Sequence, residues 1–164
     1  MPSDAVLYQA AALCLTYPDD DFRARLALLR EAAPQLREFV DHATVTAPRE
    51  LAEHYVQVFG LDDRHSLYLS RWPDADARRR AMSPVRFQEA YRAAGLELTG
   101  EELPDFLPAV LELTARTGDT GLLTAHRDGL ERLRSRLTDA GTPYASVLDA
   151  VCATLPPARA GAGG

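Results

Sequence analysis

The sequence lacks the features of several common protein classes. It has no lysine, so all eighteen of its basic residues are arginine, and its two cysteines, Cys14 and Cys152, stand far apart and outside any Cys-x-x-Cys pair. This cysteine usage excludes the sequence motifs of zinc sites and thiol–disulfide enzymes. No stretch approaches the ~20 apolar residues of a membrane span, and the first four residues lack the regions of a signal peptide. We therefore expect a cytoplasmic protein that does not insert into a membrane.

Motifs of catalytic and cofactor-binding sites are also absent. The four histidines have no metal-ligand spacing, and there is no P-loop, no Gly-x-Ser-x-Gly elbow and no dinucleotide-binding glycine motif. The net charge of −6 argues against nucleic acid as a partner, because phosphate binding needs clustered positive charge. We predict that the chain is not an enzyme, holds no cofactor or metal, and prefers a basic partner.

The sequence does contain helical periodicity. Its 46% hydrophobic and 26% charged residues are typical of a soluble globular protein, and apolar residues recur at helical spacing with almost no strand alternation. A chain of this length can bury about 68–70% of its unfolded surface. We predict an all-α fold: a single compact domain of about eight helices, a helical bundle over residues 1–155, followed by a disordered tail at 156–164.

Caps and helix-breaking residues set the predicted helix boundaries. We expect eight helices, with these boundaries: about Asp4, as N-cap, to Leu15; from Asp19–Asp21 with Phe22, Leu26 and Leu29 buried; from Pro34 with Leu36, Phe39 and Val40 apolar; Pro48 to Gly60; about Asp74 to Gly95, kinked or split at Pro84; from Asp105 to Gly118; one long helix carrying Leu123, His126, Leu130, Leu133 and Leu137, ended by Gly141; and a last helix with Thr142 as N-cap and Pro143 at the first position.

The segment from Glu101 to Pro108 is the most informative part of the chain. Pro104 and Pro108 stand four residues apart, and a proline inside a helix costs roughly 3 kcal/mol. If Asp105 is the N-cap, Pro104 lies outside the helix and Pro108 falls at its third position, where the missing N–H has no intrahelical partner. The spacing therefore predicts a stiff acidic elbow that opens a helix.

Around this elbow the sequence resembles a known family. The pattern Glu-Leu-Pro-Asp-x-Leu-Pro-x-x-Leu-Glu, together with the segments 55–61, 66–69, 78–82, 86–96, 129–133 and 141–145, resembles the NarJ-like nitrate reductase assembly chaperones (nitrate reductase delta subunit), a branch of the redox-enzyme maturation proteins. The resemblance covers most of residues 5–155. Four positions depart from the family pattern, namely Ala75, Ala81, Pro84 and Phe106, the last standing where the family often has histidine.

The resemblance implies a function. A chaperone of this family would bind the N-terminal segment of the catalytic (alpha) subunit of a respiratory nitrate reductase and keep it competent for molybdenum cofactor insertion before membrane attachment. A related molybdenum reductase is the alternative client. We assign eight residues to client binding. They lie in the irregular segment that contains Tyr68 and Trp72, in the elbow, or on the predicted fifth and seventh helices: Tyr68, Trp72, Tyr91, Glu102, Pro104, Asp105, Phe106 and His126.

Five of these assignments have a structural alternative. Asp105 could be an N-cap, with or without a client contact, and Phe106 could be a core residue; Tyr68 and Trp72 could anchor a loop, and His126 could be a half-buried histidine with satisfied hydrogen bonds. Two other function classes stay open. One is a helical regulatory or nucleic-acid-binding domain, which would need a basic helix around residues 78–92. The other is a molybdenum-cofactor transferase or nucleotide hydrolase, which the missing phosphate loop disfavours.

Overall fold

Helices make up the regular structure throughout the described part of the chain. A computed structural model describes residues 2–60, 63–69, 72, 89–93, 95 and 105–156. Within these ranges the extended backbone contributes only an isolated bridge between Tyr68 and Phe106. This confirms the predicted all-α fold.

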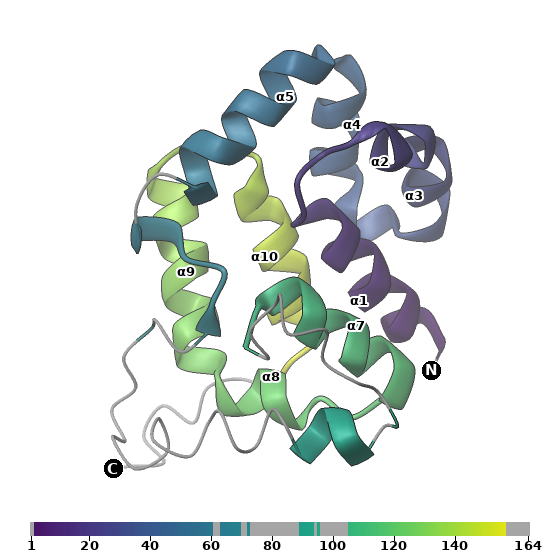
Figure 1. Ribbon diagram of the computed structural model, residues 1–164, viewed down its shortest axis with the longest axis vertical. Helices are drawn as coiled ribbons and strands as arrows, with labels where there is room; N and C mark the ends of the chain where they lie inside the picture. The colour runs from purple at the N-terminus through teal and green to yellow at the C-terminus, as the bar shows by residue number, and fades with distance from the viewer. Residues whose placement is uncertain are drawn as a thin grey trace.

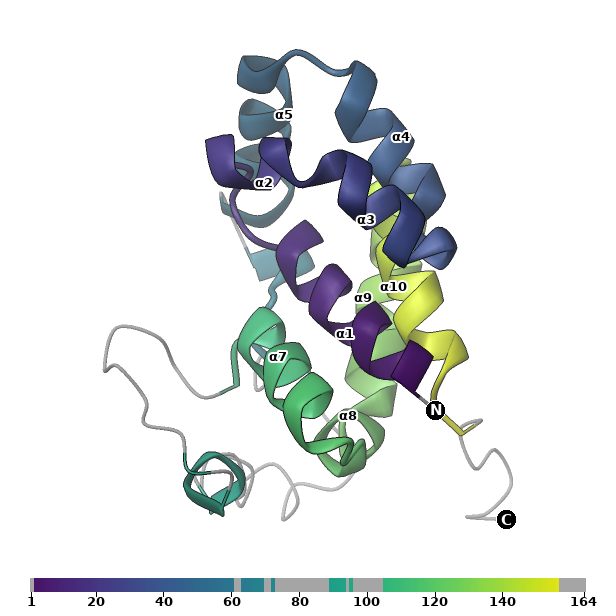
Figure 2. The same cartoon turned by 90° about the vertical axis from the view of Figure 1, so that its right-hand side faces the viewer.

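Helix α1 (Pro2–Cys14) lies at the centre of the packing (Figures 1 and 2). It packs against α7 (Leu107–Thr117) on one side and α10 (Tyr144–Ala153) on the other, and α10 in turn packs against α9 (Arg127–Asp139). Three consecutive alanines of α1, residues 10–12, are at most 3% exposed. Their small side chains allow neighbouring helices to approach closely on two sides, which explains the central position of α1.

Shorter helices cover the end of the molecule at the top of Figure 1. These helices and turns, in chain order, are α2 (Asp20–Ala24), α3 (Leu26–Ala32), the 3₁₀ turn η1 (Pro34–Leu36), α4 (Arg37–Val45) and α5 (Pro48–Tyr55). The π-helical turn η2 (Val56–Gly60) continues α5, and the 3₁₀ turn η3 (Asp63–His65) packs against α9. The short α8 (Gly121–Ala125) joins α7 to α9. None of the helices in the described ranges is long and apolar enough to cross a bilayer.

Many of the predicted boundaries are confirmed. The Asp19 carboxylate accepts a hydrogen bond from the Phe22 amide at 2.8 Å, as an N-cap does. Gly118 and Gly141 have φ values of 74° and 72°, a conformation that favours glycine after a helix. The predicted stripes on the second and third helices are buried, and so are the four leucines predicted for the seventh.

Five boundary predictions are wrong; one concerns the last helix, because α10 begins at Tyr144 with Pro143 as its N-cap, one residue later than predicted. Helix α1 begins at Pro2, so Asp4 lies inside it rather than at its N-cap. The second predicted helix breaks at Arg25, whose amide bonds back to the carbonyls of residues 22 and 23. The long seventh helix breaks at His126, because its ring Nδ1–H donates to the Leu122 carbonyl at 2.9 Å and competes with the helical backbone bond. Helix α7 begins after Phe106 rather than after Asp105.

The two cysteines are part of the core. Cys14 is 1% exposed and Cys152 is 5% exposed, and both are free thiols. Burial raises the pKa of Cys14 to about 12 and that of Cys152 to about 11. Both observations agree with the role of small buried hydrophobes. The beginning of the predicted fifth helix lies outside the described residues, as do residues 157–164 of the predicted tail; residues 89–93 are helical.

Candidate functional site

A short antiparallel bridge joins the irregular segment before Trp72 to the start of α7. The Leu69 amide donates to the Asp105 carbonyl at 3.0 Å, and the Leu107 amide donates to the Leu67 carbonyl at 2.8 Å. Leu67 and Leu69 are 4% and 2% exposed. Since side chains alternate along extended backbone, Tyr68 between them points to the opposite side and stays partly exposed.

The bridge places two partly exposed aromatic rings together. The rings of Tyr68 and Phe106 lie 5.0 Å apart between centroids, with 36° between their planes. Such aromatic pairs are favourable by ~0.5–1.5 kcal/mol beyond their burial. We call Tyr68 and Phe106 the aromatic pair. It forms an apolar surface at the N-terminal end of α7. Both of its residues are among those predicted from the sequence to bind the client.

Asp105 does not cap α7. The N-cap is Phe106, with ψ of 120° and no side-chain cap, and Pro108 is at the second helical position rather than the third. The bridge explains this difference, because it holds Phe106 in extended backbone and delays the helix by one residue. Asp105 is only 6% exposed, so it is a buried residue just before α7.

Trp72 lies beneath this segment rather than on its surface. Its side chain is 6% exposed, and its indole N–H donates to the Ser66 carbonyl at 2.9 Å. The Arg136 guanidinium stacks 5.2 Å from the ring centroid, and Gly129 of α9 faces the Trp72 Cβ so closely that a Cβ there would lie 2.9 Å from it. Trp72 therefore anchors the segment to α9 and fixes where the aromatic pair sits.

The remaining predicted site residues are distributed over other parts of the chain. Tyr91 is 6% exposed on helical residues 89–93, and His126 is partly buried at the junction of α8 and α9. Glu102 and Pro104 lie outside the described residues. The structure thus brings together Tyr68, Asp105 and Phe106, with Trp72 behind them.

The sequence did not predict that aromatic residues near α5 form a cluster that reaches the surface. Tyr17 and Tyr55 pack edge to face at 5.9 Å, and Tyr55 and Phe59 lie 5.1 Å apart; all three are at least partly exposed. Burial, with a smaller contribution from the nearby Tyr68 phenol, raises the pKa of Tyr55 to about 12. The (i, i+4) spacing of Tyr55 and Phe59, which places both rings on one helix face, was the available clue.

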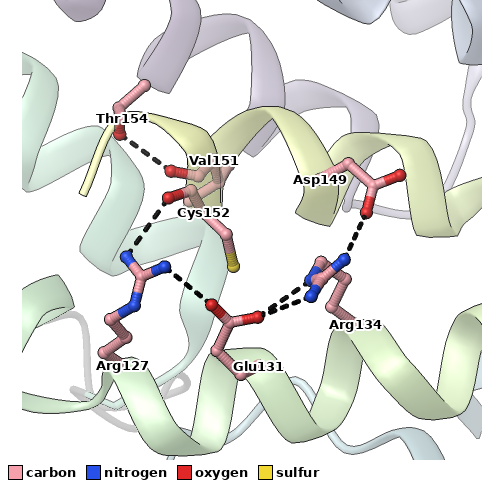
Figure 3. A network of polar contacts seen from close by, with 7 residues as sticks. All are labelled: Arg127, Glu131, Arg134, Asp149, Val151, Cys152 and Thr154. Atoms are coloured by element: carbon pink, nitrogen blue, oxygen red, sulfur yellow. Dashed lines mark hydrogen bonds and ion pairs between the residues drawn. The ribbon is translucent and has the colours of Figure 1, made fainter. Parts of the chain in front are cut away.

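A polar network between α9 and α10 belongs to the scaffold (Figure 3). Glu131 accepts from Arg127 at 2.7 Å and from Arg134 at 2.9 Å, and Arg134 also donates to Asp149 of α10 at 3.2 Å. Arg127 donates further to the Cys152 carbonyl near the end of α10 at 3.2 Å. These bonds clamp α9 to α10.

Within the described ranges, no group of three or more histidine, cysteine, aspartate or glutamate side chains is arranged to hold a metal ion.

Comparison with known proteins identifies the family. Residues 23–149, most of the chain, match the family described as "Nitrate reductase delta subunit". The chain belongs to this family, which confirms the resemblance found around the elbow.

Three relatives illustrate the similarity. Over 160 residues the chain is 34% identical to the nitrate reductase-like protein NarX of Mycobacterium tuberculosis, covering 91% of this chain and 24% of NarX, so that it spans about a quarter of that relative's length. It is 28% identical over 162 residues to the probable nitrate reductase molybdenum cofactor assembly chaperone NarJ of Bacillus subtilis, covering 92% of this chain and 88% of NarJ. It is 30% identical over 154 residues to NarW of Escherichia coli, also a probable nitrate reductase molybdenum cofactor assembly chaperone, covering 88% of this chain and 66% of NarW.

Proposed function

We propose that this protein is a cytoplasmic assembly chaperone for a respiratory nitrate reductase. It binds the N-terminal segment of the catalytic (alpha) subunit and keeps that subunit competent for molybdenum cofactor insertion before the enzyme attaches to the membrane. The chaperone itself catalyses no bond change and holds no cofactor. The observation that carries this proposal is the near full-length alignment with NarJ of Bacillus subtilis, a probable nitrate reductase molybdenum cofactor assembly chaperone.

The aromatic pair supports the proposal as a binding surface. Tyr68 and Phe106 offer apolar area on a rigid base, because the bridge and the buried Leu67 and Leu69 fix the backbone on which they stand. Aromatic anchors of this kind dominate the energetics of many protein interfaces. We propose that Tyr68 and Phe106 contact the client segment directly, whereas Trp72 and Asp105 position them.

The other predicted contact residues, Tyr91, Glu102, Pro104 and His126, remain predictions that are separate from the aromatic pair. The overall charge of the chain supports a basic client segment, since the net charge is −6 and opposite charge accelerates encounter. Apolar contacts would then hold the complex, because they are not screened by salt as exposed charges are. Raising salt should therefore slow association more than it speeds dissociation.

The test is co-purification combined with cofactor analysis. The chain would be expressed with the nitrate reductase catalytic subunit encoded in the same genome, and the complex isolated through a tag on the chain. We expect the catalytic subunit to co-purify, and its molybdenum content to fall sharply when the chain is deleted. A catalytic subunit that neither co-purifies nor loses molybdenum on deletion would contradict the proposed function.

A further inference from the structure

Two histidines on successive helices lie close together at the end of the molecule that α5 forms (Figure 1). His42 belongs to α4 and His54 to α5, and their rings are 6.3 Å apart between centroids, at 63° to each other. His54 also stacks on the ring of Tyr144, the first residue of α10, at 5.7 Å and with 7° between the planes. His54 therefore lies where α4, α5 and α10 meet.

A side-chain hydrogen bond joins His54 to the residues that lead into α10. His54 Nε2 and Thr142 Oγ1 are 2.7 Å apart, and the same Oγ1 accepts from the Tyr144 amide at 3.3 Å. Thr142 is only 6% exposed, so its hydroxyl hydrogen needs an acceptor inside the protein. Among the hydrogen bonds of the described residues, His54 Nε2 supplies that acceptor. Neutral His54 therefore accepts at Nε2 and carries its ring hydrogen on Nδ1.

Protonation reverses the role of this nitrogen. Both ring nitrogens of an imidazolium are donors, so Nε2–H would face the Thr142 hydroxyl and leave the hydroxyl hydrogen buried without an acceptor. His65 behaves differently, because its Nδ1 lies 3.0 Å from the Val58 carbonyl, which can only accept. That nitrogen is a donor in both protonation states, so the bond of His65 survives protonation.

The surroundings of His54 do not offset an added positive charge. Burial, with a smaller contribution from the His42 ring, lowers the pKa of His54 below its ordinary value of 6.5. Burial also raises the pKa of the Tyr144 phenol far above its ordinary value, so that ring stays neutral. η2 has no charged residue. The charged side chains of α4 and α5 are exposed or paired with each other or with Arg30: Arg37, Glu38, Asp41, Arg49, Glu50 and Glu53.

α5 is attached to the rest of the protein by few buried groups. Of its eight residues, Leu51 is the one that is buried, while His54 and Tyr55 are partly buried. The Tyr55 hydroxyl adds a hydrogen bond to the Leu15 carbonyl at 3.1 Å. Segments with so few buried contacts open locally at a lower free energy than the core does. Loss of the His54 bond should therefore be felt first as local opening of α5.

We propose that the His54–Thr142 hydrogen bond is a pH-sensitive latch, which protonation of His54 breaks so that α5 detaches from the start of α10 in mildly acidic solution. The polar network of Figure 3 keeps α9 and α10 together meanwhile. Detachment uncovers the Tyr144 ring, which is 0% exposed in the closed form. Because the pKa of His54 is lower when the latch is closed, its contribution to stability is complete above about pH 6.5 and is lost as the pH falls below that value. The latch acts within this chain, whatever client it binds.

The experiment measures amide hydrogen exchange of the full chain by mass spectrometry, at about pH 7.5 and about pH 5.5, with rates corrected for intrinsic exchange at each pH. His54→Gln keeps an acceptor, since the glutamine carbonyl can take the place of Nε2, but it does not titrate. The matched control is His65→Asn, whose amide can still donate to the Val58 carbonyl. In the wild type we expect the protection of α5 amides to fall several-fold, and by at most about tenfold for each pH unit below 6.5.

The amides of α9 should lose less protection than those of α5. We expect His54→Gln to abolish the pH response of α5 and His65→Asn to retain it. Equal α5 protection at the two pH values in the wild type, a wild-type response in His54→Gln, or an equal loss in α5 and α9 would each overturn the latch. If His54→Gln fails to fold, an NMR titration of the His54 ring in the wild type decides, because a pKa at or above 6.5 contradicts the latch and a lower one supports it.

Discussion

The aromatic pair and the Trp72 anchor belong to the same short segment but behave as two different regions. Tyr68 and Trp72 are four residues apart, and both were predicted as client-binding residues. Tyr68 lies partly exposed against Phe106. Trp72 is buried against α9, with its indole N–H donating to the Ser66 carbonyl. One side of the segment forms a surface, and the other holds that surface in place.

This difference shows how a short irregular segment can present aromatic rings without being mobile. The buried leucines, the bridge hydrogen bonds and the Trp72 anchor fix the backbone, so the exposed rings lose little further entropy on binding. The two sides should therefore respond differently to substitution: stability should depend on the buried side, and client affinity on the exposed side.

The largest effect is expected from Trp72→Ala. Removing a buried tryptophan leaves a cavity and typically costs about 3–5 kcal/mol. The substitution also leaves the Ser66 carbonyl without its indole donor and Arg136 without its ring partner. Urea unfolding measures the loss. A change as small as that of a surface residue would show that Trp72 does not anchor the segment, and the contrast between its two sides would fail.

Gly129→Ala should destabilise the protein from the opposite side of the same contact. A Cβ at this position would lie 2.9 Å from the Trp72 Cβ, so either α9 or the segment must shift, at a cost of about 1–3 kcal/mol. Ser135→Ala on the exposed part of α9 is the control, and we expect little change there. If Gly129→Ala stabilises the protein, the helical propensity of alanine outweighs the contact and the packing against Trp72 is loose.

Tyr68→Ala should have a smaller effect on stability, within about 1 kcal/mol, because the ring is partly exposed. Its effect should instead appear in the affinity for the client's N-terminal segment, measured by calorimetric titration beside a thermal melt. Unchanged affinity together with a large drop in melting temperature would assign Tyr68 to the core, with Trp72.

The smallest effect on stability is expected at Cys14, in the buried core, which contrasts with the exposed aromatic pair. Burial raises the pKa of Cys14 from 9.0 to about 12, so its thiol stays protonated in the folded protein while the unfolded thiol begins to ionise near pH 9. This contribution to stability is complete below pH 9 and is lost as the pH rises toward 12. We expect stability to fall over that window less steeply in Cys14→Ala than in the wild type, and native thiol labelling to be slow until denaturant is added. Fast labelling of the native protein would show that the core opens readily.

Much of the fold was predictable because it depends on local patterns. The stripe of α7, with Leu107, Val110, Leu111 and Thr114, follows from helical periodicity, and all four side chains are buried. The aromatic pair was predicted as two separate candidate residues, since nothing in the sequence pairs position 68 with position 106. The helix start at Phe106 and the burial of Trp72 depend on partners far away in the chain, namely the bridge to Leu67 and Leu69 and the close approach of Gly129.

The most direct test of the central claim, that the aromatic pair receives the client segment, is a calorimetric titration of Phe106→Ala with the client's N-terminal peptide. Leu28→Ala is the control, because Leu28 is a large apolar side chain that is 65% exposed on α3, away from the pair. We predict that Phe106→Ala weakens binding by about tenfold or more and loses far less stability than Trp72→Ala, while Leu28→Ala binds as the wild type does. Equal affinities for Phe106→Ala, Leu28→Ala and the wild type would contradict the account.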